Sequence, residues 1–232
     1  MAHPRSGLSR FYLLLGAVAL AGVATLAWLV WKPKSVSIPA GVVVEVTDTS
    51  GFRGYLLGSD AAPVEVTEYA DYQCPACRDF ELVQFPTVRR QLIESGQVRW
   101  RYRDFPLDGA HRYARMAAHA AACANDQGKY WEMHRAIYDR QSEWSVARDA
   151  AGRFRDYATV IGLAGADYDS CMRSARYAGR IQASANEGQQ LGVPATPTFL
   201  IGGRLYPGVM ASDSMRAVVQ RLLPAASPPP TP

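Results

Sequence analysis

The chain has 232 residues, of which 48% are hydrophobic and 20% are charged, and its formal net charge is +4. This is ordinary globular composition, enough for one large domain or two small ones. The basic residues are spread along the chain without a Lys/Arg block, which argues against a nucleic-acid-binding groove. The 4 cysteines are too few to define a small domain held together by disulfides.

An uncharged stretch from Phe11 to Trp31 follows a short flank at residues 1–10. As a helix rising ~1.5 Å per residue it would be roughly 30 Å long, the thickness of a bilayer core. A cleaved signal peptide ending near Ala24 or Ala27 is the alternative, but the stretch exceeds the ~7–15 apolar residues usual in signal peptides. We expect an uncleaved transmembrane anchor, and both interpretations export the rest of the chain.

Residues 32–53 are predicted to form a linker, with a short edge strand over Val42–Val46. Residues 224–232 are rich in proline and predict a disordered tail. Everything between them, residues 54–223, is predicted to be one domain in which strand and helix patterns alternate.

Four segments of this domain have the residue content of strands. They are Val64–Tyr69, Val98–Phe105, Thr198–Ile201 and Arg204–Tyr206, and Gly202-Gly203 between the last two is typical of a hairpin. Helical patterns cover Pro75–Ile93 (with a kink expected at Pro86), Ala110–Asp126, Lys129–Arg140, Phe154–Ile161, Asp167–Arg173, Ala178–Leu191 and Ser212–Leu222. This order predicts an α/β, thioredoxin-like fold with an inserted helical domain at about residues 108–192, preceded by an N-terminal transmembrane helix.

The sequence Cys74-Pro75-Ala76-Cys77 directly follows a predicted strand and opens a predicted helix. The N–H groups and dipole of a helix start stabilise a thiolate and can lower a cysteine pKa to ~3.5–7.5. We therefore expect Cys74 to be the exposed nucleophile, Cys77 the buried resolving thiol, and Pro75-Ala76 a determinant of the reduction potential.

The motif has two other interpretations. Half of a zinc site would need a second Cys/His pair at short spacing, but Cys123 and Cys171 stand alone and no two histidines form an HxxxH pair. We therefore expect no metal and no cofactor. An inert structural disulfide at the motif is the second alternative.

Thr196-Pro197 stands immediately before a predicted strand. A cis bond cannot be read from sequence, but a proline here, in this order after the CxxC motif, matches the cis-proline position of thioredoxin-like folds. We expect Thr196 and Pro197 to bind substrate, because peptide groups beside such a proline can pair with an extended segment. Glu68 alternates with valines on a predicted strand and is a candidate proton shuttle for Cys77, unless it is an edge carboxylate in solvent.

The region from Gly58 to Pro207 resembles the DsbA-like thiol–disulfide oxidoreductases of the thioredoxin superfamily. The resembling stretches are Glu68–Glu81, Arg101–Leu107, Ala122–His134 and Leu191–Gly203. The resemblance implies a CxxC active site, a cis-proline at Pro197 and a buried acid at Glu68. Ala76 and Thr196 depart from the best-studied oxidase of the family, so its strongly oxidising character does not carry over.

Cys123 and Cys171 are the cysteines left once the CxxC pair is assigned. In an exported protein an even number of cysteines favours pairing, and proteins that this chain resembles often bridge the two corresponding helices. We expect a structural disulfide between them. The alternative is a pair of buried free thiols that pack as small hydrophobic groups.

The sequence thus predicts a membrane-anchored enzyme, in the periplasm or at the cell-envelope exterior, that exchanges disulfides with exported proteins. Net oxidation is favoured because disulfides persist outside the cytoplasm. The expected partners are exported protein substrates and a membrane redox partner that reoxidises or reduces the CxxC pair, with no nucleic acid. The alternatives are a membrane-tethered peptide-binding or chaperone module with a structural disulfide, and a dedicated thiol reductase.

Overall fold

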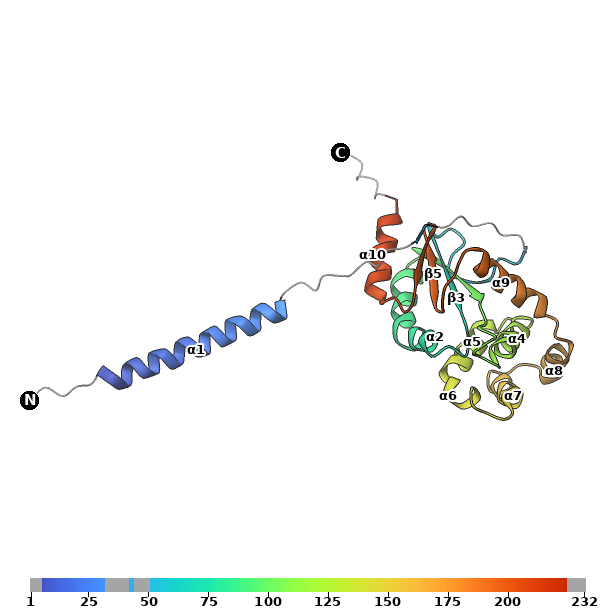
Figure 1. The fold of residues 1–232 in the computed structure, drawn as a ribbon, viewed down its shortest axis with the longest axis horizontal. Coiled ribbons are helices and arrows are strands. Elements are labelled where there is room, and N and C mark those ends of the chain that lie inside the picture. Colours follow the sequence, from blue (N-terminus) through green and yellow to red (C-terminus); the bar gives the residue numbers. More distant parts are fainter. Residues whose placement is uncertain (1–5, 32–41, 44–50, 225–232) are drawn as a thin grey trace, which may run out of the picture. The chain divides into compact units, whose positions relative to one another are not determined.

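The computed structural model describes residues 6–31, 42–43 and 51–224, which divide between two compact units, Met1–Ser37 and Ile38–Pro232 (Figure 1). In the first unit, helix α1 (Ser6–Trp31) begins inside the segment predicted as a flank. Within the part of the chain that the structure describes, no helix combines the length and the apolar character needed to cross a membrane. Most of the predicted linker and nearly all of the predicted tail lie outside the described residues.

The second unit contains a six-stranded sheet among its described residues, in the order β1-β6-β5-β3-β4-β2. The strands are β1 (Val42–Val43), β2 (Tyr55–Leu57), β3 (Val64–Ala70), β4 (Val98–Asp104), β5 (Thr198–Ile201) and β6 (Arg204–Pro207). Strands β3 and β4 are parallel, and each of the other pairings is antiparallel. Four of these strands match the predicted segments to within one residue. Strand β2 was not predicted, because three residues are too few to show alternation.

One continuous helical segment follows β3 and carries the CxxC motif; it is called the active-site helix below. It consists of α2 (Pro75–Asp79), η1 (Phe80–Gln84), α3 (Phe85–Val88) and η2 (Arg89–Ile93), of which η1 and η2 are π-helical turns. Pro86 was expected to kink this helix. In the wider turn just before Pro86, the Phe85 N–H donates to the Phe80 carbonyl. The helix continues through Pro86, so its missing N–H does not end the helix.

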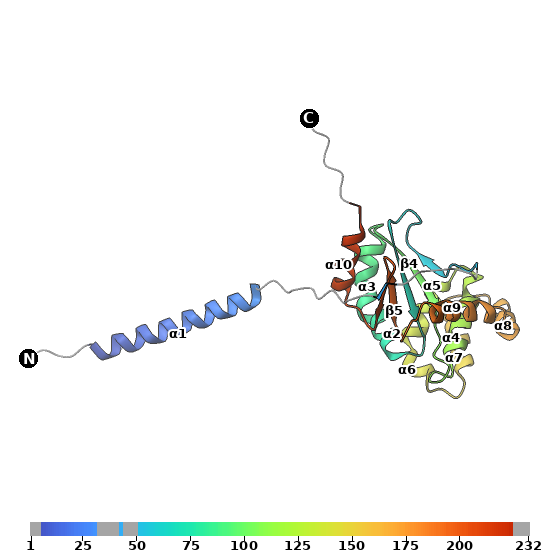
Figure 2. The ribbon, with the colours of Figure 1, turned by 45° about the horizontal axis from the view of Figure 1, so that its top comes forward.

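The two faces of the sheet are covered by different helices (Figures 1 and 2). On one face, Val66, Trp100 and Phe199 form a core with Phe80 of the active-site helix and Met215 of α10 (Ser212–Leu222). Helix α9 (Ala178–Gln190) lies on the other face.

Gly188 allows α9 to approach the sheet closely. A Cβ atom at this position would lie 2.5 Å from Cδ2 of Phe105 and 3.2 Å from Cδ1 of Tyr69. A side chain larger than hydrogen would therefore push α9 away from the end of β4.

Between β4 and β5 the chain forms a block of helices. They are α4 (Ala114–Asn125), α5 (Tyr130–Asp139), α6 (Gln141–Trp144), α7 (Ala150–Val160), α8 (Gly165–Ser174) and α9. The Ala-rich helix α4 begins four residues later than predicted, after turns at residues 107–113. Its alanines are buried around the whole circumference rather than on one face, because such small side chains let neighbouring helices pack from several directions. Helix α7 begins earlier than predicted, where the Asp149 side chain accepts a hydrogen bond from the Gly152 N–H.

Candidate active site

The CxxC cysteines lie where β3 passes into the active-site helix. Cys74 is the N-cap of α2 and Pro75 is the first helical residue. Both cysteines are free thiols, with Cys74 7% exposed and Cys77 fully buried. Cys74 is therefore less exposed than we expected, because the loop before β5 covers it. Its Sγ donates a hydrogen bond to the Thr196 carbonyl oxygen at 3.3 Å.

The environments of the two thiols push their pKa values apart. The pKa of Cys74 falls from its ordinary value of 9.0 to about 6, chiefly through hydrogen bonding by the Cys77 thiol. The Thr196 side chain and the N–H groups of Cys77 and Ala76 act in the same direction, against the effect of burial. Burial and the neighbouring Cys74 raise the pKa of Cys77 well above its ordinary value. At neutral pH the reduced pair thus carries a thiolate at Cys74 and a thiol at Cys77.

The loop before β5 forms the second side of the site. The Thr196–Pro197 peptide bond is cis. The Pro197 carbonyl accepts a hydrogen bond from the Gly208 N–H at 2.8 Å, and the Thr198 hydroxyl donates to the Ala195 carbonyl at 2.6 Å. These bonds fix the loop against the β6–α10 connection, so that Thr196 stays over the Cys74 sulfur.

Glu68 lies beneath the cysteines on β3 and is fully buried, so it is not the edge carboxylate considered as an alternative above. Neither carboxylate oxygen has a hydrogen-bond partner among the described residues. Burial raises the pKa of Glu68 well above its usual range, and the nearby Glu81 carboxyl raises it further. A carboxyl group with a raised pKa beside a buried thiol is suited to proton transfer.

Residues that the sequence did not single out hold the active-site loop in place. The Gln141 amide of α6 donates to the carbonyl oxygens of Tyr72 at 2.7 Å and of Cys74 at 2.9 Å. The Asp71 carboxylate accepts hydrogen bonds from the N–H groups of Gln73 at 2.6 Å and Leu107 at 2.7 Å. No sequence signal marked Gln141, because it acts from a helix of four residues that was itself not predicted.

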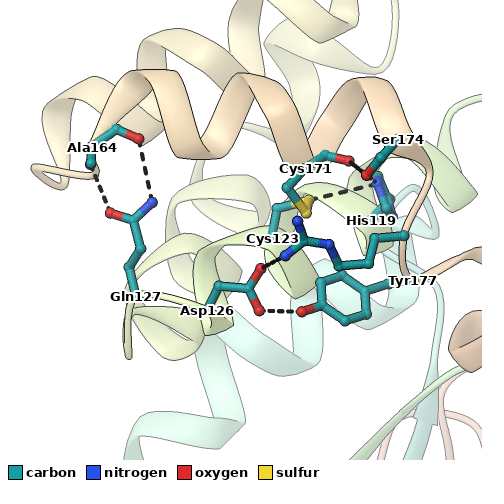
Figure 3. Close-up of a disulfide and its surroundings, with 9 residues drawn as sticks. His119, Cys123, Asp126, Gln127, Ala164, Cys171, Ser174 and Tyr177 are labelled. Carbon is teal, nitrogen blue, oxygen red and sulfur yellow. Dashed lines mark hydrogen bonds and ion pairs between the residues drawn. A yellow bond between two sulfur atoms is a disulfide. The ribbon is translucent and has the colours of Figure 1, made fainter.

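The other two cysteines are joined by a disulfide between α4 and α8 (Figure 3). The imidazole Nε2 of His119 donates to the Cys171 carbonyl at 3.2 Å and lies 3.6 Å from Cys123 Sγ. Burial lowers the pKa of His119. Three side chains that could bind a metal lie together here: His119, Cys123 and Cys171. The two sulfurs are joined in a disulfide, however, and metal sites use cysteine thiolates, so this group is a poor metal site. This grouping was not predicted, although the i, i+4 spacing of His119 and Cys123 on one helix indicates it.

Polar contacts on both sides of the disulfide also join these helices (Figure 3). Asp126 at the end of α4 accepts hydrogen bonds from Arg176, at 2.9 Å, and from the Tyr177 hydroxyl. The Gln127 amide exchanges hydrogen bonds with the backbone of Ala164 just before α8. The disulfide is therefore one part of a larger α4–α8 contact.

Comparison with known proteins identifies the family. A family model described as thioredoxin matches residues 52–221. Disulfide bond formation protein D of Bacillus subtilis is 23% identical over 171 residues, covering 72% of this chain and 76% of that protein. The crystal structure of oxidised BdbD from Bacillus subtilis has a TM-score of 0.68 at 21% identity, covering 79% of this chain and 98% of that one. The predicted thioredoxin-like fold with a helical insertion is confirmed.

A different kind of relative is much longer than this chain. The protein named Na(+)/H(+) antiporter NhaA 3 of Salinispora tropica is 31% identical over 220 residues, which are 90% of this chain and 32% of that protein. The chain thus spans about a third of the length of such curated relatives.

The lowered pKa of Cys74 predicts how its alkylation depends on pH. In the reduced protein, the rate of reaction with iodoacetamide should rise through a midpoint at about pH 6, because only the thiolate reacts. The Cys77→Ala variant isolates Cys74 and removes the side-chain hydrogen bond that is the largest cause of the shift, so its midpoint should move upward. A midpoint near that of an ordinary thiol in the unmodified protein would contradict the prediction. Stopped-flow absorbance at 240 nm, which follows thiolate formation, provides an independent measurement.

Removal of the Cys123–Cys171 disulfide should destabilise the domain. The bond closes a loop with a sequence separation of 48, for which the chain-entropy relation gives an upper figure of roughly 4 kcal/mol. The Cys123→Ala/Cys171→Ala double variant should therefore lose about 2–4 kcal/mol in urea-induced unfolding. The matched control is Cys74→Ala/Cys77→Ala, whose sulfurs span only one helical turn. Equal stability of the two double variants would contradict a structural role for the 123–171 bond.

Proposed function

This chain belongs to the thioredoxin family, and we propose that it is a DsbA-like thiol–disulfide oxidoreductase in which Cys74 and Cys77 exchange disulfides with exported proteins in the direction of net oxidation. The observation that carries this proposal is the pKa of about 6 at Cys74. Between about pH 6 and pH 9 the Cys74 thiolate stabilises the reduced enzyme progressively, and a stabilised reduced form makes a stronger oxidant.

The positions of the two cysteines assign their roles in the reaction. A substrate thiolate attacks Sγ of Cys74 in the oxidised enzyme, the bond to Cys77 breaks, and Cys77 takes up a proton from Glu68. A second substrate thiolate then attacks the substrate sulfur of this mixed disulfide, and Cys74 leaves as the thiolate. The substrate loses two electrons in forming its disulfide, and the enzyme gains them as a dithiol. Because Cys74 retains the lower pKa, it is the better leaving group of the pair.

Thr196 and Pro197 are proposed to bind the substrate segment next to the reacting sulfur. The Thr196 carbonyl already contacts Cys74 Sγ at 3.3 Å. Nearby, Val209 follows the glycine that bonds to Pro197 and is 48% exposed, which offers an apolar contact for a substrate side chain. An extended peptide lying between these residues would bring its own sulfur to Cys74.

The location and partners of the enzyme are proposed from the sequence. The uncharged stretch Phe11–Trp31 would tether the domain to a membrane, with the catalytic unit on the extracytoplasmic side. A relative that bears the name of a disulfide bond formation protein supports a role in forming disulfides. A membrane redox partner would return the CxxC pair to its starting state after each exchange.

Trapping of mixed disulfides tests the proposed roles. The Cys77→Ser variant should accumulate disulfide-linked complexes with unfolded exported proteins whose cysteines carry glutathione as mixed disulfides. The Cys74 thiolate attacks the protein sulfur, glutathione leaves as the thiolate, and no resolving thiol is present to release the protein. Cys74→Ser should form none and serves as the matched control. Complexes with Cys74→Ser but not with Cys77→Ser would reverse the assignment.

The reduction potential of the CxxC pair decides whether the enzyme oxidises or reduces its substrates. Equilibration with glutathione should give a value nearer to about −120 mV than to about −270 mV. A value near about −270 mV would instead indicate the dedicated reductase, and a pair that does not equilibrate at all would indicate the binding module with a structural disulfide.

The tether predicts where the protein is found in cells. The full-length chain should fractionate with membranes and resist carbonate extraction, and protease added to cells with a permeabilised outer envelope should digest the catalytic domain. Replacing Leu14 and Val18 with Asp should release the protein, because a charge in the middle of a span is expensive. A mature form that begins near residue 28, or full protection from protease, would contradict the tether.

A further inference from the structure

A cluster of polar side chains continues beyond Glu68, away from the cysteines. Glu81 on η1 lies next to Glu68 and is 8% exposed. Its Oε1 atom is 3.3 Å from Nε2 of His134 on α5, which is 2% exposed. Neither of these two atoms has another hydrogen-bond partner among the described residues. The cluster therefore forms a line of three titratable groups: Glu68, Glu81 and His134.

This line ends at a cavity. A space of about 220 Å³ between the active-site helix and α5 is lined by Glu81, His134, Trp131 and Tyr138. Arg89 and Arg135 also line it and are exposed, so that the cavity reaches the surface. Water in this cavity can contact the His134 imidazole and the Glu81 carboxyl directly.

The buried resolving thiol needs such a route. In each cycle Cys77 takes up one proton when it leaves Cys74 and gives one back when the disulfide re-forms. Both Cys77 and Glu68 are fully buried, so neither can exchange this proton with bulk water. We propose that Glu81 and His134 relay protons between Glu68 and the water in this cavity. The inference rests on the proposed exchange function of Cys74 and Cys77 and adds the path by which its proton travels.

The proton transfers balance with the redox step. When Cys77 attacks a Cys74 mixed disulfide, the Cys77–Cys74 bond forms and the bond from Cys74 to the partner sulfur breaks. The Cys77 sulfur is oxidised, and the partner leaves as a reduced thiolate. The proton of Cys77 passes to Glu68, from Glu68 to Glu81, from Glu81 to Nε2 of His134, and from there to water. In the reverse direction each transfer is reversed.

The groups around this line support transfer along it. Nδ1 of His134 is hydrogen-bonded to the Tyr72 hydroxyl at 2.8 Å, which leaves Nε2 directed at Glu81. Trp100 lies near Glu68 and lowers the pKa of that carboxyl, against the larger effect of burial. Burial raises the pKa of four neighbouring tyrosine hydroxyls well above the ordinary value: Tyr72, Tyr102, Tyr130 and Tyr138. These hydroxyls therefore stay protonated and do not take part in the proton transfer.

A single-turnover measurement tests the relay. A mixed disulfide between Cys74 and glutathione is prepared on the full-length protein, and release of glutathione by Cys77 is followed at pH 7. Glu81→Gln, His134→Gln and His134→Ala should each slow release at least about tenfold, since a positioned proton-transfer group contributes roughly 10²–10⁴-fold. Glu68→Gln gives the size of the effect when the first group in the line is removed.

Asp104→Asn is the matched control. Asp104 is also a buried carboxyl without a hydrogen-bond partner among the described residues, but it faces Asp71, Arg103 and Arg180. The release rate of this variant should stay within about twofold of the unmodified protein. Alkylation of the Cys74 thiolate should be unchanged in the Glu81 and His134 variants, since neither residue touches that sulfur.

Chemical rescue separates a relay from a structural role. Imidazole added to the buffer should restore most of the release rate of His134→Ala, because the ring fits the space vacated beside the cavity, whereas it should not affect Asp104→Asn. Unchanged release rates in the Glu81 and His134 variants, or slow release in His134→Ala and His134→Gln that imidazole does not restore, would overturn the relay while leaving the exchange function intact. Failure of the unmodified protein to release glutathione would instead overturn the proposed function and the relay with it.

Discussion

The rest of the site depends on the complete burial of Cys77 beneath the start of a helix. Burial keeps this thiol protonated, while hydrogen bonding from it helps to ionise Cys74 above it. The two sulfurs thus differ in reactivity although they belong to one turn of one helix. The same burial separates the thiol from water, which is why the proposed proton path begins at the buried carboxyl groups of Glu68 and Glu81.

The opposite face of the sheet meets a different constraint, that of buried charge. Arg101 and Arg103 point away from the cysteines, and both form ion pairs with Glu187 of α9. The Tyr69 hydroxyl donates to the same carboxylate. Removing one member of such a group would leave an uncompensated buried charge, which is strongly destabilising. The network therefore ties the last inserted helix to β3 and β4, the strands that lead into the active site.

The sequence predicted the parts of this molecule that depend on local patterns. The strands were recognisable from β-branched and aromatic residues, and the CxxC motif from its place between a strand and a helix. Features that depend on tertiary contacts were not predictable. They are the covering of Cys74 by Thr196, the hydrogen bond from Gln141 to the Cys74 carbonyl, and the burial of α4 on every side. Glu81 is an intermediate case. Its i+4 spacing from Cys77 places it on the same helix face, but only the structure shows that His134 meets it there.

The two cysteine pairs also show how one chain can keep one disulfide reactive and another inert. Cys74 and Cys77 span a single helical turn, so their bond constrains little of the unfolded chain, and Cys74 keeps 7% of its surface exposed. Cys123 and Cys171 connect two helices far apart in sequence, and both are 1% exposed. Exchange requires in-line approach of an attacking thiolate to a sulfur atom. At Cys123–Cys171, the packing of α4 against α8 leaves no room for an attacking thiolate. Disulfide exchange at Cys74 and Cys77 can therefore proceed without rearranging the Cys123–Cys171 bond.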